Sequence, residues 1–290
     1  MKPAAFTYHR PTSLDEALAL LAEFGASARL LAGGQSLGPM LNLRMARPEH
    51  VIDVNDLTEF AYVRQLGDFV EVGGLTRHHQ VAQSPCLQQH CPLLTEAAST
   101  IGHYAIRQRG TLGGSLANAD PAAQLALVAV TLGAQMTLVR RQGQRQLTAD
   151  EFFIGAMTTA LQPQEMLQSV RFPKFKANEA SAFCMFNRRH GDFAMVAAAT
   201  TVTLQDGRAQ HLRLALGGVA PTPLRLDQVA QQFEGRLVNT RWAEDLATAA
   251  AKAIEPPEDE RIPASYRKEL AKTLSLRAIH QALKKLEATA

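Results

Sequence analysis

Two glycine-containing segments have the residue types to bind an anionic ligand. The first, Leu30 to Leu37, contains Gly33-Gly34, and the second, Thr111 to Ser115, contains Gly113-Gly114. A glycine pair has no Cβ atoms to hold a ligand away, so successive backbone N–H groups can turn toward a phosphate. An isolated pair more often makes only a tight turn. The prediction of a dinucleotide site therefore depends on both segments and their surroundings.

Cysteine and histidine offer no comparable site. The three cysteines, Cys86, Cys91 and Cys184, are too few for the four thiolates of an iron–sulfur cluster and indicate no disulfide framework. The nine histidines are scattered without the spacing of metal ligands. No activated nucleophile or carboxylate pair is recognisable either. We therefore predict binding residues here, with no metal site and no catalytic residue.

Composition excludes several functional classes. The chain has 290 residues, 46% hydrophobic and 20% charged, which is typical of a globular protein large enough for two domains. A net charge of +3, with no basic arm, does not favour nucleic acid as a partner. No run is long enough for a transmembrane helix, and the start of the chain lacks the apolar core of a signal peptide. We expect a cytoplasmic protein.

A strand, a helix and a further strand are predicted around the first glycine segment. Ser13 can cap a helix, with Glu16 returning the bond, and Gly25 can end it. The strand 29–32 then leads directly into the segment, as ligand loops do at strand ends in open α/β folds. No G-x-G-x-x-G motif opens a helix in this chain. Further strands are expected at 51–54 and 69–73.

The second glycine segment is expected to be a loop before a helix. Pro121 suits the first turn of that helix, and apolar residues from Leu125 to Leu132 supply its buried face. Asp120 can cap the helix, bind a hydroxyl group of a cofactor, or do both. Strands at 135–139 and 166–172 complete this part of the chain.

Residues 173–178 are interpreted as a domain boundary. Strands are predicted at 194–204 and 212–219, around the hairpin signal Asp206-Gly207. Helices follow at 242–254 and 265–286. The last helix is expected to bury Tyr266, Leu270, Leu274, Ala278 and Leu283, and to expose to solvent or a partner Arg267, Lys268, Lys272, Lys284 and Lys285.

Four motifs in order along nearly the whole chain carry a family resemblance. They are the first glycine segment with Pro39, Met40 and Arg44; residues 101–120, with Ile101-Gly102 and Ile106-Arg107 before the second segment; Arg188 to Ala194; and Tyr266 to Leu270. Together they resemble the FAD subunits of molybdenum hydroxylases. These are the medium subunits of aerobic carbon monoxide dehydrogenase and of bacterial xanthine and N-heterocycle dehydrogenases.

The resemblance implies an α+β fold in two domains. Residues 1–176 would form a two-part FAD-binding domain of the PCMH, vanillyl-alcohol-oxidase-like type. Residues 177–290 would form a C-terminal α+β domain with a small antiparallel sheet and helices. The family often has asparagine where this chain has Ser115, whose shorter side chain makes a water-mediated contact possible. The cofactor-binding residues implied are Leu30, Leu31, Ala32, Gly33, Gly34, Gln35, Ser36, Leu37, Ile101, Thr111, Leu112, Gly113, Gly114, Ser115, Asn118, Asp120 and Leu167.

The implied function is electron transfer within a complex. FAD on this chain would receive electrons from [2Fe-2S] clusters on a small subunit, after a large subunit with a molybdenum-pterin cofactor has oxidised the substrate. The assembly implied is a dimer of heterotrimers. The substrate is expected to contact the large subunit rather than this chain. A stand-alone flavin oxidase and a non-catalytic nucleotide-binding assembly protein are the alternatives.

Two features near the expected flavin have open interpretations. Arg188, Arg189 and Asp192 can form an ion-pair network that joins the domains, or can place charge near the flavin or a partner's clusters. His103 can hydrogen-bond the flavin ring or fill space beside it.

Overall fold

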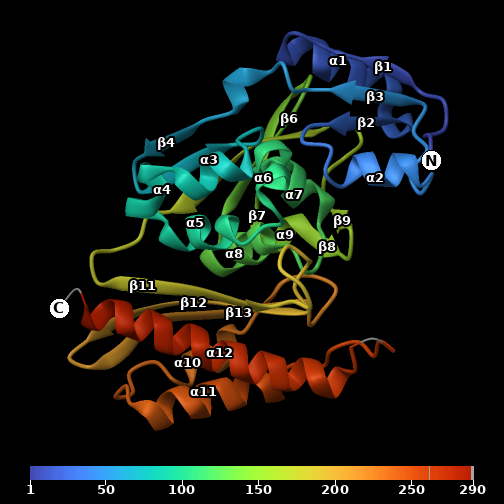
Figure 1. Ribbon diagram of the computed structural model, residues 1–290. Coiled ribbons are helices and arrows are strands. Elements are labelled where there is room, and N and C mark those ends of the chain that lie inside the picture. The colour runs from blue at the N-terminus through green and yellow to red at the C-terminus, as the bar shows by residue number, and fades with distance from the viewer. Residues whose placement is uncertain (261, 289–290) are drawn as a thin grey trace.

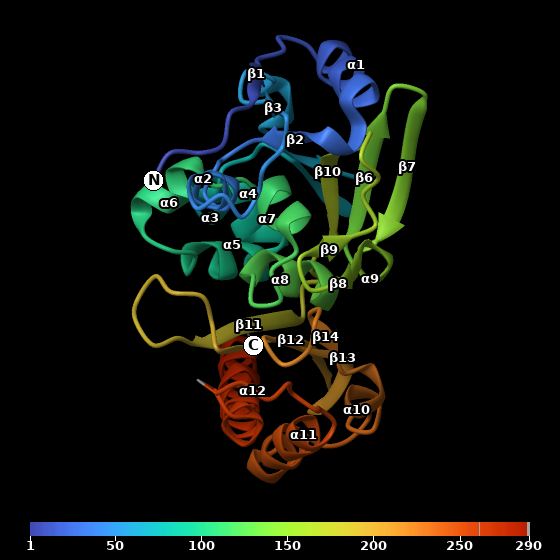
Figure 2. The same ribbon diagram turned by 90° about the vertical axis from the view of Figure 1, so that its right-hand side faces the viewer.

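The computed structural model describes residues 1–260 and 262–288, which form three stacked parts (Figure 1). An amino-terminal lobe lies at one end, a middle lobe of helices and antiparallel sheet follows, and the carboxyl-terminal part lies at the other end (Figure 2). Arg261 and residues 289–290, which belong to the predicted C-terminal domain, lie outside the described residues. The mixture of helix and sheet confirms the predicted α+β class.

The amino-terminal lobe is a three-stranded parallel sheet in the order β1-β3-β2. Ser13 caps the first helix as predicted, by accepting the N–H of Glu16. The Glu16 carboxylate, however, bonds Thr12 rather than Ser13, because Thr12 offers both its N–H and its hydroxyl. Gly25 ends the helix with φ 49°. The elements are β1 (Thr7–His9), α1 (Leu14–Phe24), η1 (Gly25–Ser27), β2 (Ala28–Leu31), α2 (Leu37–Asn42), β3 (His50–Asp53) and η2 (Thr58–Phe60).

The middle lobe joins a five-stranded antiparallel sheet, β4-β5-β10-β6-β7, to a set of short helices. The strands predicted at 69–73, 135–139 and 166–172 are confirmed. Of the six helices between residues 78 and 132, the sequence predicted only the last. Its elements are β4 (Val63–Leu66), β5 (Phe69–Gly73), α3 (His78–Gln83), α4 (Pro85–His90), α5 (Pro92–Ser99), α6 (Tyr104–Arg109), α7 (Leu112–Asn118), α8 (Gln124–Leu132), β6 (Gln135–Arg140), β7 (Gly143–Thr148), α9 (Ala149–Phe152), β8 (Phe153–Gly155), β9 (Thr158–Thr159) and β10 (Met166–Pro173).

A buried carboxylate ties three strands of this sheet together. Glu71 on β5 is 2% exposed and accepts hydrogen bonds from the Tyr62 hydroxyl, Arg64 and Arg171. Burial raises the pKa of Glu71, but the bonds from Arg171, Tyr62 and Arg64 outweigh it and hold the pKa below its usual value. The charge is therefore paired where the sheet excludes water.

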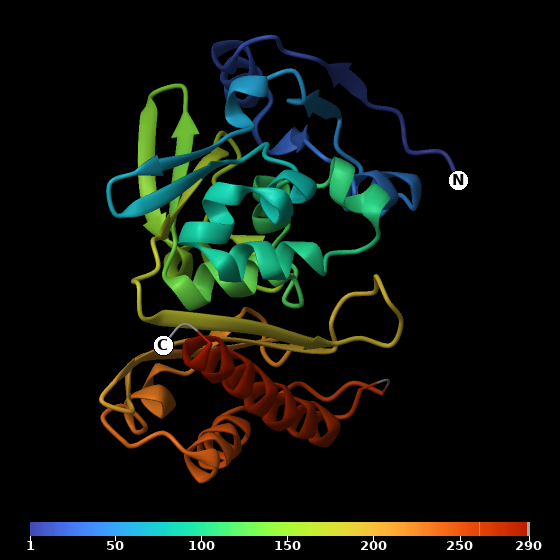
Figure 3. The same ribbon diagram turned by 60° about the vertical axis from the view of Figure 1, so that its left-hand side comes forward.

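The carboxyl-terminal part is a four-stranded antiparallel sheet, β11-β12-β13-β14, between two helical layers (Figure 3). Alternate residues enter different cores, since Phe183 packs with residues of α5 and α8, whereas Ala182 packs with residues of α11 and α12. The predicted hairpin is confirmed, with φ 51° at Asp206 and 70° at Gly207. The elements are β11 (Glu179–Phe186), β12 (Val196–Gln205), β13 (Arg208–Gly217), β14 (Leu224–Arg225), α10 (Asp227–Gln231), α11 (Thr240–Lys252) and α12 (Ala264–Glu287).

The last helix buries a different set of residues from the predicted one. Leu270, Leu274 and Ala278 are buried as expected, but Tyr266 is 43% exposed and meets only the edge of the Phe186 ring. The Arg267 side chain was expected at the surface, yet it is 11% exposed and donates to the carbonyls of Met195 and Gly218. Lys285 likewise bonds the Ser181 carbonyl and Glu96. These basic groups fasten the helix to the sheet and the middle lobe.

Candidate cofactor-binding site

The first glycine segment connects β2 to α2 and presents unsatisfied donors. In the described part of the chain, the N–H groups of Gly33, Gly34, Gln35 and Ser36 have no protein acceptor. The segment is half-exposed, and Gly34 has φ 68°, a conformation that favours glycine. Adjacent free N–H groups form a concave site for an anion, so this segment has the donors that the sequence predicted.

The second glycine segment is the first turn of α7, so the prediction of a loop is wrong here. Thr111 caps the helix by accepting the Gly114 N–H at 3.0 Å. Leu112, Gly113 and Ser115 donate their N–H groups to Thr76, Gly74 and Thr111 carbonyls. The helix cap, the chain at 74–76 and the helix itself thus use the N–H groups of residues 112–115, so the adjacent free donors lie in the first segment. Contact of the second segment with a cofactor stays a prediction.

The glycines of the second segment instead permit close packing. A Cβ atom added to Gly113 would lie 2.7 Å from the carbonyl oxygen of Gly74. Gly114 is exposed, and a Cβ atom there would lie 4.0 Å from the Ala32 side chain. The surface of α7 at Gly114, which carries no side chain, therefore faces Ala32 of the first segment.

The first segment makes a close backbone contact with the two residues that precede the second segment. A Cβ atom added to Gly33 would lie 2.3 Å from the carbonyl oxygen of Arg109 and 2.7 Å from the Cα atom of Gly110. Gly110 in turn accepts the N–H of His78 at 2.9 Å. The buried His78 ring also bonds the Thr111 carbonyl through Nε2, and burial lowers the pKa of His78 to about 4. A neutral histidine thus supports the second segment at neutral pH.

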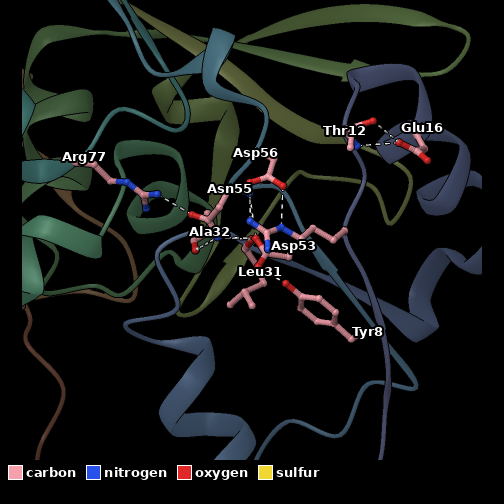
Figure 4. Close-up of polar contacts among 10 residues, drawn as sticks. Tyr8, Thr12, Glu16, Leu31, Ala32, Asp53, Asn55, Asp56 and Arg77 are labelled. Atoms are coloured by element: carbon pink, nitrogen blue, oxygen red, sulfur yellow. Dashed lines mark hydrogen bonds and ion pairs between the residues drawn. The ribbon is translucent and has the colours of Figure 1, made fainter.

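Two side chains that sequence analysis did not single out bridge the segments (Figure 4). Asn55, two residues after β3, donates from Nδ2 to the Ala32 carbonyl at 2.8 Å. Arg77 donates from Nη2 to Oδ1 of Asn55 at 2.6 Å and from Nη1 to the Arg109 carbonyl at 2.5 Å. The parallel pairing of β2 and β3 could have placed Asn55 beside the first segment, since both strands end at one edge. Nothing in the sequence indicated Arg77.

The bridge places positive charge beside the free N–H groups. Arg77 is half-buried and bonds neutral oxygens, and both burial and the nearby Arg109 hold its pKa below the usual value. Asp53 lies on the other side of Asn55, where it accepts hydrogen bonds from Asn55 and the Tyr8 hydroxyl. Burial raises the pKa of Asp53, but these bonds lower it below its usual value. The Asp53 carboxylate therefore already has hydrogen-bond donors within the protein.

Asn118 is the last residue of α7, about 10 Å along the helix axis from Thr111, and Asp120 lies in the turn that follows the helix. Asp120 does not cap the next helix, as one interpretation expected. Its carboxylate accepts the N–H of Ala122 at 2.8 Å, and α8 starts only at Gln124. Pro121 lies in this turn rather than in the helix, so the cap position falls on Ala123.

The apolar residues predicted at the site are largely inside the protein. Ile101 is 9% exposed and Leu167 6%, both in the core of the middle lobe. Leu167 is near the second segment, because its carbonyl oxygen would be 2.4 Å from a Cβ atom on Gly74, the residue whose carbonyl accepts the Gly113 N–H. Leu30 packs in the amino-terminal lobe, Leu31 accepts the Val54 N–H, and Leu37 starts α2. Contact of these residues with a cofactor stays a prediction.

The Arg188 to Ala194 motif lies mainly in the loop between β11 and β12, which rises from the sheet toward the middle lobe (Figure 2). Arg188, Arg189 and Asp192 are exposed and form no ion pair with any described residue, so the predicted network is wrong. Contact with the middle lobe is made by rings: His103 and His190 have centroids 5.4 Å apart. A Cβ atom on Gly191 would lie 2.6 Å from His103.

Comparison with known proteins identifies the class to which this fold and site belong. The family model described as "FAD binding domain in molybdopterin dehydrogenase" matches residues 4–175, and the model "CO dehydrogenase flavoprotein C-terminal domain" matches residues 181–282. The chain belongs to this family of FAD-binding flavoprotein subunits, which confirms the resemblance carried by the four motifs and the two-part FAD-binding fold.

Particular relatives match over nearly their whole length. Caffeine dehydrogenase subunit beta from Pseudomonas sp. (strain CBB1) is 41% identical, over 97% of this chain and 96% of its own. The carbon monoxide dehydrogenase medium chain of Hydrogenophaga pseudoflava is 36% identical, over 97% and 98%. The solved structure of carbon monoxide dehydrogenase from that organism covers 98% of this chain and 99% of its own, at 37% identity and a TM-score of 0.94. Quinoline 2-oxidoreductase from Pseudomonas putida 86 has a TM-score of 0.94 at 33% identity, with 99% of each chain covered.

The described residues contain no group of three or more His, Cys, Asp and Glu residues arranged to hold a metal ion. None of their helices combines the length and apolar character needed to cross a membrane.

Proposed function

We propose that this chain is the FAD-carrying electron-transfer subunit of a heteromeric molybdenum hydroxylase. It takes electrons from [2Fe-2S] clusters of a partner subunit and passes them to an external acceptor. The observation that carries the proposal is the row of four free N–H groups at Gly33–Ser36, beside the bare face of α7, in a chain that belongs to an FAD-binding family. FAD supplies the redox chemistry, exchanging one or two electrons at its ring system.

The residues of the site have binding roles in this proposal. The N–H groups of Gly33–Ser36 hold the pyrophosphate against the surface of Gly114 and Ser115. One carboxylate oxygen of Asp120 accepts the Ala122 N–H, and the second is left for a hydroxyl of the cofactor, with Asn118 beside it. Ile101 and Leu167 lie toward the ring system. No residue of the chain serves as an acid, a base or a nucleophile.

The proposed assembly contains a small iron–sulfur subunit and a large molybdenum subunit, paired as a dimer of heterotrimers in the cytoplasm. The substrate would contact the molybdenum subunit. Similar proteins support this, because caffeine dehydrogenase, carbon monoxide dehydrogenase and quinoline 2-oxidoreductase each contain a chain closely similar to this one. We also propose that residues 1–176 and 177–290 are the two domains, joined by the connection between Pro173 and Glu179.

The visible spectrum of the purified chain tests the proposal, recorded alone and with its partner subunits, before and after dithionite. Flavin bands that bleach in both samples, with iron–sulfur bands in the complex only, are expected. A colourless chain in both samples would overturn the FAD assignment in favour of an assembly protein. Bleaching of the isolated chain by an organic substrate, without dithionite, would instead identify a stand-alone oxidase.

A further inference from the structure

We propose that Arg77 and Asn55 are a positioning pair that sets FAD affinity by holding the two glycine segments together. The inference rests on the proposed function, and neither residue belongs to a glycine segment. Asn55 follows β3, and Arg77 precedes α3. Their side chains complete a chain of contacts from the Ala32 carbonyl to the Arg109 carbonyl.

The backbone around Arg77 supports the second segment. Residues 74–78 and 110–113 are paired: Leu112 donates to Thr76, Gly113 to Gly74, and His78 to Gly110, at 2.8–2.9 Å. Arg77 itself pairs with Thr111 in an antiparallel bridge. The backbone of Arg77 is therefore fixed to the second segment, and its guanidinium group extends toward the first segment.

The bonding geometry requires both side chains. Arginine presents several donors in a rigid plane, so Nη1 and Nη2 can bond two acceptors at once. Asn55 accepts from Arg77 through Oδ1 while its Nδ2 group donates to Ala32, a combination that only a side-chain amide provides here. A lysine at 77 or an aspartate at 55 would each lose one half of the bridge.

Charge links the pair to an anionic ligand. Both acceptors of Arg77 are neutral, so its half-buried guanidinium has no carboxylate bonded to it, and the Asp53 carboxylate on the other side of Asn55 offsets only part of the cost of its burial. Such a charge is costly to keep away from water, and a bound pyrophosphate beside Gly33–Ser36 would offset it. The pair is therefore expected to favour binding of an anionic ligand at the first segment.

The test is an FAD titration of the full-length chain, freed of flavin, followed by flavin fluorescence. Arg77→Met and Asn55→Ala are each expected to weaken FAD binding about tenfold to hundredfold, from the loss of charge-assisted and buried hydrogen bonds. Arg77→Lys keeps the charge but bonds one acceptor, so it should recover only part of the loss. The double variant should bind no more weakly than Arg77→Met, because both changes break the same bridge.

Two controls separate positioning from other effects. Arg29→Met removes the same charge from an exposed side chain that bonds only the Ala26 and Ala28 carbonyls, and should bind FAD as the wild type does. Melting temperatures of the flavin-free variants should show that each variant is folded at the temperature of the titration. Wild-type affinity in Arg77→Met, or losses that add in the double variant, would overturn the inference. If the wild-type chain binds no FAD, the proposed function itself fails.

Discussion

The contact between Gly33 and the backbone before the second segment makes Gly33→Ala an informative perturbation. The alanine Cβ atom would lie 2.3 Å from the Arg109 oxygen, whereas real Cβ atoms keep at least 3.0 Å. The segments must therefore separate by about 0.7 Å. Rotation of a side chain cannot relieve the overlap, because the obstacle is backbone held by the His78–Gly110 hydrogen bond. Overpacking of this kind costs about 1–3 kcal/mol of folding stability.

The effect on FAD binding should be larger. A displacement of about 0.7 Å lengthens a 2.9 Å hydrogen bond to about 3.6 Å, beyond useful range. Loss of two bonds to a charged phosphate, each contributing about 1.5–3 kcal/mol, weakens FAD binding by at least about a hundredfold.

Flavin fluorescence titration and thermal unfolding of the flavin-free chain measure the two effects separately. Gly155→Ala is the matched control, because its Cβ atom would lie 3.8 Å from Thr158, which is an ordinary van der Waals contact. Wild-type affinity in Gly33→Ala would show that the close approach does not set the geometry of the site, and would refute the reasoning.

Three further predictions concern stability. Because the pKa of His78 falls from 6.5 to about 4 on folding, the unfolded chain binds a proton that the folded chain does not over this range. Stability should therefore decrease as the pH falls from 6.5 toward 4, by about 3 kcal/mol in total, and urea unfolding of His78→Gln should show a smaller decrease. Glu71→Gln leaves two arginines without their shared carboxylate and should lower the free energy of unfolding by about 2–3 kcal/mol, measured in urea; an unchanged midpoint would contradict this. Asp192→Asn should leave the melting temperature unchanged, because the exposed Asp192 has no ion pair with the described residues; a clear decrease would revive the structural role.

Features encoded within a few residues could be predicted from the sequence. The Ser13 cap, the Gly25 stop and the Asp206-Gly207 hairpin each depend on contacts between neighbours in the chain, so their residues suffice. The short helices α3 to α7 could not be predicted in this way. Their apolar patterns are too brief to show a period, and tertiary packing stabilises them.

The sequence by itself determined the family and the position of the first glycine segment, since ordered motifs and glycine content are local properties. Only the tertiary structure decided that the second segment is a capped helix whose donors are already used. The tertiary structure also brings the Arg77 side chain to Asn55, although the two residues are 22 positions apart in the sequence. In the same way, the Arg267 side chain bonds the carbonyl of Met195, which is 72 positions away. The physical reason is that a side chain's hydrogen-bond partner depends on which elements pack together, and sequence spacing does not report that distance.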